Sequence, residues 1–297
     1  MVDLVTYVDR MPKLGETLEA PEFQMGCGGK GANQAIAASR LGASVRMITR
    51  VGDDAFGPNT VKNFEDNGID TSWVLTTEGS SGVAPIFVDE DSNNSILIIK
   101  GANNKLSPDD VKDASDEIAS AKLMVLQLEV PLETVYTAID TAAEHGVPVL
   151  LNPAPAVAEL DPAYVAKCTY FVPNETELSL LVGRDLVELD EIEAAAIELM
   201  ADSALEHLLV TLGSRGVLWV HDSQATLIES VAVDAVDSTG AGDAFIGSFA
   251  ASLVAGADVE GAIAEANLYA AHSVTGKGTQ TSYATKDEFE TWKSERS

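Results

Sequence analysis

The chain has 297 residues, of which 46% are hydrophobic, so it can bury a sizeable core and fits one large α/β domain. Aspartate and glutamate total 47 against 18 lysines and arginines, and the formal net charge of -29 disfavours nucleic acids and anionic membranes as partners. No apolar run approaches the length of a membrane span, and the first residues lack a basic region followed by an apolar one, so we expect a cytoplasmic protein.

The acidic residues are spread along the chain instead of being gathered in a tail, which together with the hydrophobic content argues against disorder. We expect a globular, halophilic protein, because high salt screens the mutual repulsion of its charges. This hypothesis predicts that the chain loses structure when salt is removed. Circular dichroism before and after desalting checks it, and an unchanged spectrum would count against adaptation to high salt.

Cysteine and histidine usage indicates neither a disulfide framework nor a zinc site. Cys27 and Cys168 lie far apart in the sequence and outside any metal-ligand spacing, so we expect two ordinary thiols. The four histidines, at positions 145, 207, 221 and 272, show no metal-ligand spacing either.

The chain opens with MVDLVTYVDR, residues 1–10, which begins like the end of a strand. Residues 12–25 and 82–100 differ from the remainder, because GVAPIFVD and NSILIIK flank a polar turn at 90–93 and predict a β-hairpin. With the segment around 17–24, this hairpin would form a small separate sheet. The alternative is an ordinary hairpin on the main sheet.

A glycine-rich turn follows at Gly26–Gly31, satisfies G-x-G-x-x-G and opens a helix predicted for 32–41, so the site of an NAD-dependent oxidoreductase has to be considered. The preceding PEFQM is short and polar for a buried parallel strand, which argues against a dinucleotide site. A P-loop fails because Lys30 is followed by glycine instead of serine or threonine. Hydroxyl recognition by hydrogen bonds suits this turn better, through Gly28, Gly29, Lys30 and Asn33.

From residue 45 onward, apolar runs alternate with amphipathic stretches. The runs predict strands at 45–52, 123–129, 147–153, 170–174 and 207–212, and the stretches predict helices at 57–67, 132–145 and 175–182. This βαβ rhythm predicts an α/β fold with a doubly wound, mostly parallel sheet flanked by helices. No repeat or low-complexity linker divides it, so we expect a single domain over residues 1–297.

Ligands in such sheets bind beyond the carboxyl ends of the strands, where several predicted strands here end in polar residues. For Glu129 the alternative to a ligand contact is a salt bridge. Asn174 and Glu177 equally fit a helix capping box, since Asn followed three residues later by Glu is that signature. Arg215, in TLGSRGV at 211–217, would meet phosphate or form a surface ion pair.

The stretch VDAVDSTGAGDAFIGSF, residues 233–249, carries the chemistry. Apolar residues at 231, 233 and 236 predict a short strand, after which Gly240, Ala241 and Gly242 turn into a helix from about Asp243 to Ala255, with a further helix at 258–275. The backbone amides of this turn and the positive end of the helix dipole would converge on an anion at the helix start. Asp243 would then orient a hydroxyl beside the γ-phosphoryl of ATP and accept its proton. The alternative is a plain turn with Asp243 as an N-cap.

DSTGAGD, at 237–243, closely resembles the carboxy-terminal signature of the ribokinase (phosphofructokinase-B type) family of sugar kinases. The partner signature is GCGGKGANQA at 26–35. Further similar segments follow in family order across nearly the whole chain, namely GVAPIFVD, QLEVP at 127–131, NPAPA at 152–156, PNETE at 173–177 and TLGSRGV. The resemblance implies a ribokinase-like fold with a small β-sheet lid over the sugar, from segments 12–25 and 82–100, and a homodimer that pairs through the lid.

The resemblance also implies a role for each matching residue. Asp243 would be the base, with an anion hole at Gly240, Ala241, Gly242 and Asp243. The sugar would contact Asp3, Gly29, Lys30, Asn33, Glu129 and Asp243, although Asp3 also fits a solvated charge at a strand end. ATP would contact Asn174, Thr211, Gly213, Ser214, Arg215, Gly216, Gly242 and Asn267. Mg²⁺ would be held near Asn174 and Glu177, and K⁺ by Asp237, Thr239, Ser273, Gly276, Gly278 and Ser282.

One departure from the family pattern lies at the N-terminus. In the family a buried strand with a Gly-Ser-x-Asn-type ending precedes the aspartate that matches Asp3, and here Met1 stands where the asparagine is expected. We therefore expect the central sheet to be exposed at this place, and a misassigned start or a truncated chain.

The resemblance favours an ATP-dependent kinase for D-ribose that gives ribose 5-phosphate, because GGKGANQA, QLE and NPAPA are closer to ribokinases than to the family's fructose, 2-keto-3-deoxygluconate or nucleoside kinases. A kinase for one of these other substrates is the first alternative. A nucleotide- or sugar-binding protein without catalysis is the second, and the presence of Asp243 argues against it.

Overall fold

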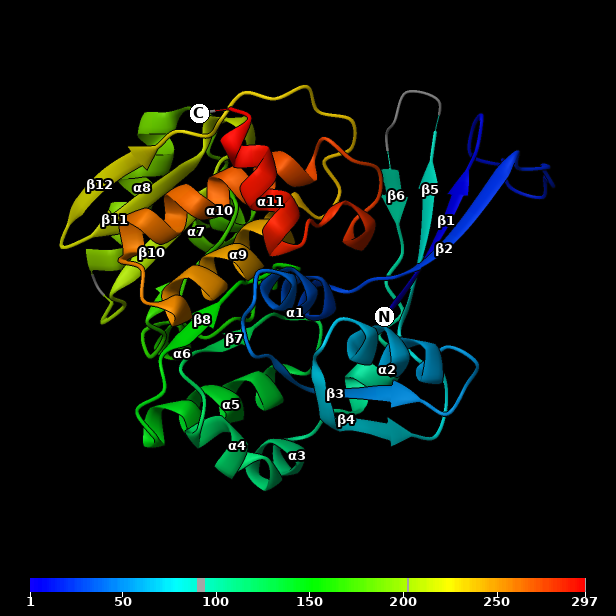
Figure 1. Ribbon diagram of the computed structural model, residues 1–297, viewed down its shortest axis with the longest axis horizontal. Coiled ribbons are helices and arrows are strands. Elements are labelled where there is room, and N and C mark those ends of the chain that lie inside the picture. The colour runs from blue at the N-terminus through cyan, green and yellow to red at the C-terminus, as the bar shows by residue number, and fades with distance from the viewer. Residues whose placement is uncertain (90–93, 202, 297) are drawn as a thin grey trace.

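The strands form three sheets in the residues that the computed structural model describes, which are 1–89, 94–201 and 203–296 (Figure 1). The largest sheet has six strands in the order β12-β11-β10-β9-β8-β7, and its members from β7 to β10 run parallel. Their bounds are β7 Met124–Leu126, β8 Val149–Leu151, β9 Tyr170–Phe171, β10 His207–Thr211, β11 Val217–His221 and β12 Gln224–Ile228.

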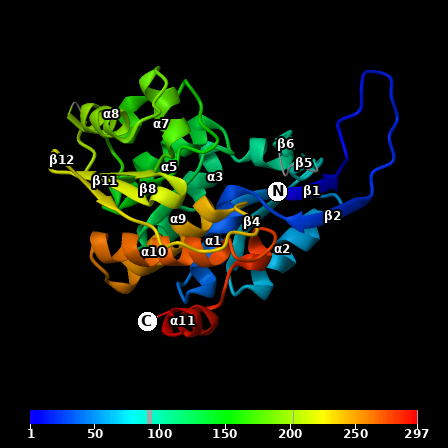
Figure 2. The ribbon, with the colours of Figure 1, turned by 90° about the horizontal axis from the view of Figure 1, so that it is seen from above.

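Helices cover both faces of this sheet, as Figure 2 shows from above. One face packs against α5 (Leu132–Glu144), α7 (Glu175–Val182) and α8 (Leu189–Ala201), and the other against α9 (Ala241–Ala255) and α10 (Val259–Ser273). The strand period of two explains the division, because Leu208 and Val210 enter the first core while Leu209 enters the second. The doubly wound, mostly parallel arrangement is therefore confirmed.

The remaining helices complete the layers. They are α1 Lys30–Arg40, α2 Gly57–Asp66, α3 Pro108–Asp113, α4 Ser115–Ala119, α6 Pro162–Val165 and α11 Lys286–Ser294, with 3₁₀ turns at Gly101–Lys105, Gly213–Arg215 and Gln280–Ser282. Within the described parts of the chain, none of the helices combines the length and hydropathy needed to cross a bilayer.

The predicted main sheet is divided. Strands β3 (Arg46–Gly52) and β4 (Asp70–Thr77) form a separate parallel pair, and β7 and β3 are each at an edge of their sheet.

The third sheet is the predicted lid, and it stands apart from the helical layers at one side of the molecule (Figure 1). Its order is β2-β1-β5-β6, with bounds Glu22–Cys27, Val2–Tyr7, Val83–Val88 and Asn94–Ile96. The alternative of a hairpin on the main sheet is wrong. The hairpin turn at 90–93 lies outside the described residues.

Two local predictions differ from the structure. The opening strand, β1, is an inner strand of the lid instead of the end of a main-sheet strand. Residues 231–236 form no strand, and Val231 and Val236 are exposed. The N–H of Val236 donates to the carbonyl of Val274 at 2.7 Å, so this segment attaches to the end of α10 and not to a sheet.

Candidate active site

Helix α9 begins at the glycine turn that the sequence predicts. Its N-cap is Gly240, with φ 79°, and the carbonyl of Gly240 accepts the N–H of Ala244 at 2.8 Å. A Cβ at this position would lie 2.2 Å from Cγ2 of Thr279, so only glycine fits. The hydroxyl of Tyr283 also donates to the Gly240 carbonyl at 2.8 Å, which fixes the turn against the loop that follows α10.

The backbone N–H groups in the first turn of α9 have no hydrogen-bond partner within the helix. They are therefore the donors that a helix start offers to an anion. The N–H of Ala241 is directed to the carbonyl of Ser238 at 3.2 Å. The predicted anion hole therefore narrows to the N–H groups of Gly242 and Asp243.

The Asp243 side chain is buried, with 8% of its surface exposed. Nδ2 of Asn33 donates a hydrogen bond to Oδ2 of Asp243, and Nε2 of Gln34 donates one to Oδ1, both at 2.9 Å. Because no side chain caps α9, the N-cap alternative for Asp243 is wrong. The acid thus faces the first turns of α1, the helix that the glycine-rich turn opens.

Close packing of two helices makes this contact possible. A Cβ at Gly247 would lie 2.5 Å from both Cβ of Ala37 and the carbonyl oxygen of Gln34, so glycine lets α9 approach α1 closely. The starts of both helices consequently meet, although their residues are more than 200 positions apart in the sequence.

Two more carboxylates surround this point. The backbone N–H of Lys30 donates to Oε2 of Glu129 at 2.9 Å. Asp3 lies against the backbone of Gly28, where a Cβ would be 2.1 Å from its Oδ2. All three acids therefore contact the segment from Gly28 to Gln34. Burial raises the pKa of Asp3 and of Glu129, and the charge of Asp243 raises each further.

The positions of Asp3 and Glu129 test the alternatives that the sequence left open, a solvated strand end for Asp3 and a salt bridge for Glu129. Asp3 is not a solvated strand end, because it is half-buried and lies against Gly28. Glu129 forms no ion pair within 4.0 Å among the described residues, and its hydrogen bond is to a backbone amide. Buried carboxylates of this kind are strong acceptors for sugar hydroxyls.

The predicted nucleotide residues gather at neighbouring strand ends. Asn174 and Thr211 form a parallel bridge, and the chain then turns through Gly213–Arg215. A Cβ at Gly216 would lie 2.1 Å from the carbonyl oxygen of Ile228, so this glycine serves chain packing as well. Arg215 forms the surface ion pair with Glu175 that was the alternative to a phosphate contact.

Comparison with known proteins shows the family of the chain. The sequence matches the family model described as pfkB family carbohydrate kinase over residues 1–286. The chain belongs to this family. A deoxyribokinase of Salmonella typhi is 55% identical over 290 residues, covering 97% of this chain and 94% of the relative. A ribokinase of Bacillus subtilis (strain 168) is 40% identical over 290 residues, covering 97% and 95%.

Solved structures of the family have the same fold. Ribokinase from Thermotoga maritima matches with a TM-score of 0.90 at 32% identity, covering 99% of this chain and 96% of that one. Arabidopsis thaliana ribokinase complexed with ribose and ATP matches with a TM-score of 0.89 at 29% identity, covering 98% and 95%. The protein is thus an ATP-dependent sugar kinase, a phosphotransferase with an alcohol group as acceptor, and the oxidoreductase alternative is wrong.

Asn174 and Glu177 are the two residues predicted near Mg²⁺, and few other oxygen ligands surround them in the part of the chain that the structure describes. Asn174 and Glu177 form the predicted capping box, in which Oδ1 of Asn174 accepts the N–H of Glu177 at 2.7 Å and Oε2 of Glu177 accepts the N–H of Asn174 at 2.9 Å. In the described residues no group of three or more acidic, histidine or cysteine side chains is placed to hold a metal. Burial raises the pKa of Glu177 and the charge of Asp243 raises it further, while the hydrogen bond from the Asn174 N–H and the charge of Lys30 lower it.

The predicted K⁺ residues come together where two loops meet. The carboxylate of Asp237 accepts the N–H of Thr239 and the N–H of Gly278, both at 2.9 Å. The hydroxyls of Ser273 and Ser282 donate to backbone carbonyls at 2.8 Å, so their lone pairs are free to face a cation. Gly276 packs against Ser282, where a Cβ would lie 3.1 Å from the serine Cβ.

Asn267, which is predicted to contact the adenine of ATP, also has a structural role. It is buried on α10, and its Nδ2 donates to the carbonyl of Ile228 at 3.1 Å. This bond holds the end of β12, and the side-chain oxygen remains for a ligand.

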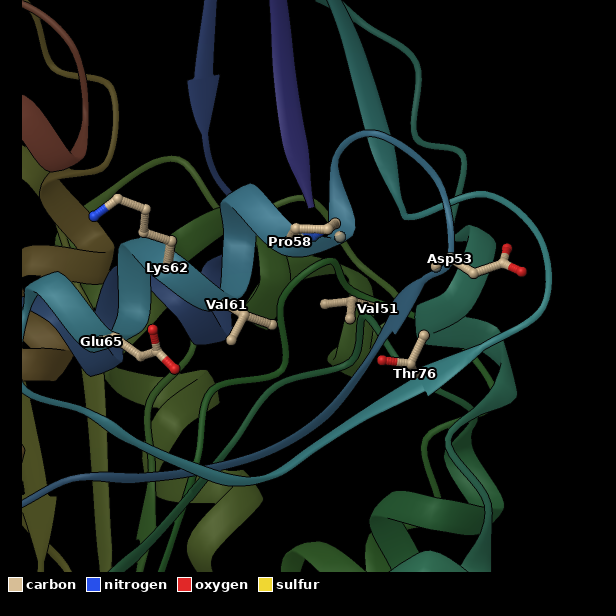
Figure 3. A pocket seen from close by; sticks show the side chains of 9 residues that line it. Val51, Asp53, Pro58, Val61, Lys62, Glu65 and Thr76 are labelled. Atoms are coloured by element: carbon tan, nitrogen blue, oxygen red, sulfur yellow. The ribbon is translucent and has the colours of Figure 1, made fainter.

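A cavity of about 290 Å³ lies between β3, β4 and α2 (Figure 3). Val51, Val61 and Thr76 line its wall, and Lys62 and Glu65 lie on the helix above. None of the predicted site residues lines it, so it is separate from the active site.

The structure adds four residues that the sequence analysis did not assign. Gln34 stands in GCGGKGANQA and could have been found there. Gln127 likewise opens QLEVP, another of the segments that resemble the family. Asn63 and Gln280 were not assigned, because their side-chain partners are 217 and 247 positions away.

Proposed function

We propose that this kinase transfers the γ-phosphoryl of ATP to the 5-hydroxyl of a pentose, with 2-deoxy-D-ribose preferred and D-ribose the second candidate. The observation that carries the proposal is the Asp243 carboxylate, which is held at the start of α9 by Asn33 and Gln34, beside Asp3 and Glu129.

The reaction follows from this placement. The sugar hydroxyl lies between Asp243 and the γ-phosphorus, and the carboxylate orients it and accepts its proton. The new O–P bond forms while the bond from the γ-phosphorus to the β–γ bridging oxygen breaks, and ADP leaves with that electron pair. The N–H groups of Gly242 and Asp243 stabilise the charge of the transferring group.

The relatives favour the deoxy sugar. The deoxyribokinase relative is 55% identical, whereas the ribokinase relatives are between 37% and 40% identical.

A coupled ADP-release assay in concentrated KCl tests the proposal over 2-deoxy-D-ribose, D-ribose, fructose, 2-keto-3-deoxygluconate and a nucleoside. We expect the largest kcat/KM with 2-deoxy-D-ribose, a smaller value with D-ribose, and values near background for the others. A larger kcat/KM for D-ribose would return the assignment to a ribokinase. Turnover of fructose or a nucleoside above both pentoses would contradict the proposal.

Two cations complete the proposed site. Mg²⁺ would sit between the ATP phosphates and the Asn174–Glu177 pair, and K⁺ would lie at the loops that carry Asp237 and Ser282. When bound, Mg²⁺ neutralises phosphate charge and K⁺ polarises the anion hole. We place the enzyme in the cytoplasm, where ATP and K⁺ are both available.

We also propose a homodimer that pairs through the lid. Apolar side chains are exposed on both edge strands of this sheet, and Phe23 and Met25 on β2 are 60% and 56% exposed. Further exposed apolar residues follow on the other side, at Ile96, Leu97, Ile98 and Ile99. A second copy would cover a surface of this size.

Phe23→Asp should therefore convert the dimer to a monomer, because a charge would be buried without a partner. Light scattering after gel filtration in high salt measures the mass. Gln24→Asp is the matched control, since successive side chains of a strand point to opposite faces. A monomeric parent protein, or a Phe23→Asp variant that stays dimeric, would contradict pairing through the lid.

A further inference from the structure

The two oxygens of Asp243 each accept one side-chain amide, and each amide is itself held by another amide. Gln280 donates from Nε2 to Oδ1 of Asn33 at 2.8 Å, and Asn63 donates from Nδ2 to Oε1 of Gln280 at 3.0 Å. Gln34, which binds the other carboxylate oxygen, is held in the same way: Nε2 of Gln127 donates to Oε1 of Gln34 at 2.6 Å. In both of these hydrogen-bonded chains, each amide directs its NH₂ group along the chain toward the carboxylate. Gln34 also donates to Oδ1 of Asn152 at 3.2 Å.

This orientation has a chemical reason. The two ends of an asparagine amide have the same shape, so sterics alone do not decide which end faces Asp243. The donor from Gln280 occupies the oxygen of Asn33 and leaves the NH₂ group toward Asp243. A reversed Asn33 would set oxygen against the carboxylate and NH₂ against NH₂, losing both hydrogen bonds.

Gln280 is itself fixed in place. It is buried, and its backbone carbonyl accepts Nη1 of Arg40 at 2.6 Å. The same guanidinium nitrogen binds the carbonyl of Tyr283 at 2.7 Å, and the Tyr283 hydroxyl holds Gly240. The 280–283 segment therefore contacts both the helix start that offers amides and, through Asn33, the acid beside it.

We propose that Gln280, supported by Asn63, is a positioning residue for phosphoryl transfer that acts through Asn33, by fixing the amide that holds the Asp243 carboxylate ionised and aimed at the acceptor hydroxyl. This inference rests on the proposed role of Asp243 as the base. It assigns a function to three segments, in α2, α1 and the 280–283 turn, that meet only in the folded chain.

The charges around Asp243 show why the amide matters. Burial raises the pKa of Asp243, while Lys30 and the hydrogen bonds from Asn33 and Gln34 lower it. The negative charge of Asp243 acts in turn on Asp3, Glu129, Glu177 and Tyr283, whose pKa values it raises. With carboxylates on several sides, loss of one amide donor raises the pKa of Asp243 further, and the base then ionises only at higher pH.

Gln280→Met tests the proposal, because it keeps the side-chain length and removes both polar groups. We expect kcat to fall about tenfold at neutral pH with small changes in KM, and the acidic limb of the kcat profile to move to higher pH. Gln224→Met, the same change at an exposed position on β12, should leave kcat and the profile unchanged. An unmoved acidic limb with normal kcat in Gln280→Met would overturn the proposal.

A double-mutant cycle separates positioning from a general structural effect. Once Asn33→Ala has removed the intermediary, adding Gln280→Met should lower kcat no further. Losses that multiply would show that Gln280 does not act through Asn33 and would overturn the proposal. If Gln280→Met fails to fold, Asn63→Leu is the second variant. It removes the hydrogen bond from Asn63 to Gln280 at a half-buried position, and the same outcomes apply.

Failure of this inference is distinguishable from failure of the proposed function. An inactive Asp243→Asn enzyme together with a normal Gln280→Met enzyme rejects only the positioning role. A fully active Asp243→Asn enzyme rejects the base, and the inference with it.

Discussion

Asp243→Asn should lower kcat about 10³-fold, because the amide cannot accept the proton of the sugar hydroxyl. The substitution keeps the size of a side chain that is 8% exposed, so the fold should persist. KM for the sugar and for ATP should change little, since Asp3, Glu129 and the nucleotide loop remain. The coupled ADP-release assay under saturating substrates measures kcat.

The control for this variant is Asp234→Asn, which makes the same change at an exposed position nine residues earlier in the sequence. It should have the parent kcat. An Asp243→Asn enzyme within tenfold of the parent would eliminate Asp243 as the base, because general-base catalysis is worth about 10²–10⁴-fold.

Gly240→Ala should lower kcat by about 10²-fold and reduce thermal stability. Its methyl group would lie 2.2 Å from Cγ2 of Thr279 and 2.8 Å from the Tyr283 hydroxyl, and its φ of 79° disfavours any side chain. The turn must shift, which moves the amides of Gly242 and Asp243 away from the phosphoryl, and one such donor is worth about 10²–10³ in kcat. Steady-state kinetics and thermal unfolding measure the two effects.

Gly256→Ala is the matched control at the other end of α9. Gly256 also has a positive φ, 100°, but a Cβ there meets nothing within 4 Å. We expect a loss of stability of about 1 kcal/mol with kcat unchanged. Equal losses of kcat in the two variants would show that backbone strain, and not the position of the amides, explains the effect of Gly240→Ala.

Local patterns predicted much of the fold and part of the site. The helix at 175–182 has the predicted bounds, because its capping box and left-handed Gly183 are both local signals. The turn into α9 was predicted for the same reason, although the helix begins two residues earlier than expected. Adaptation to high salt, the two cations and the lid dimer stay predictions.

Other features depended on which segments become neighbours. The apolar alternation at 231–236 predicted a strand, yet the N–H of Val236 donates to the carbonyl of Val274 at the end of α10. The opening strand fitted any sheet by its composition and pairs with β2 and β5 in the lid. Gln280 and Asn63 could not be assigned at all, because an isolated amide carries no signature of its partners.

The sequence by itself determined the class of fold, several of its strands and helices, and a glycine turn followed by an acid, because period, capping and turn chemistry act over a few residues. Only the tertiary structure decided that α1 packs on α9 through Gly247, that three carboxylates share one site, and that amides from distant segments orient Asp243. The physical reason is that hydrogen bonds and buried charges depend on distance in space, and the close approach of two helices sets that distance.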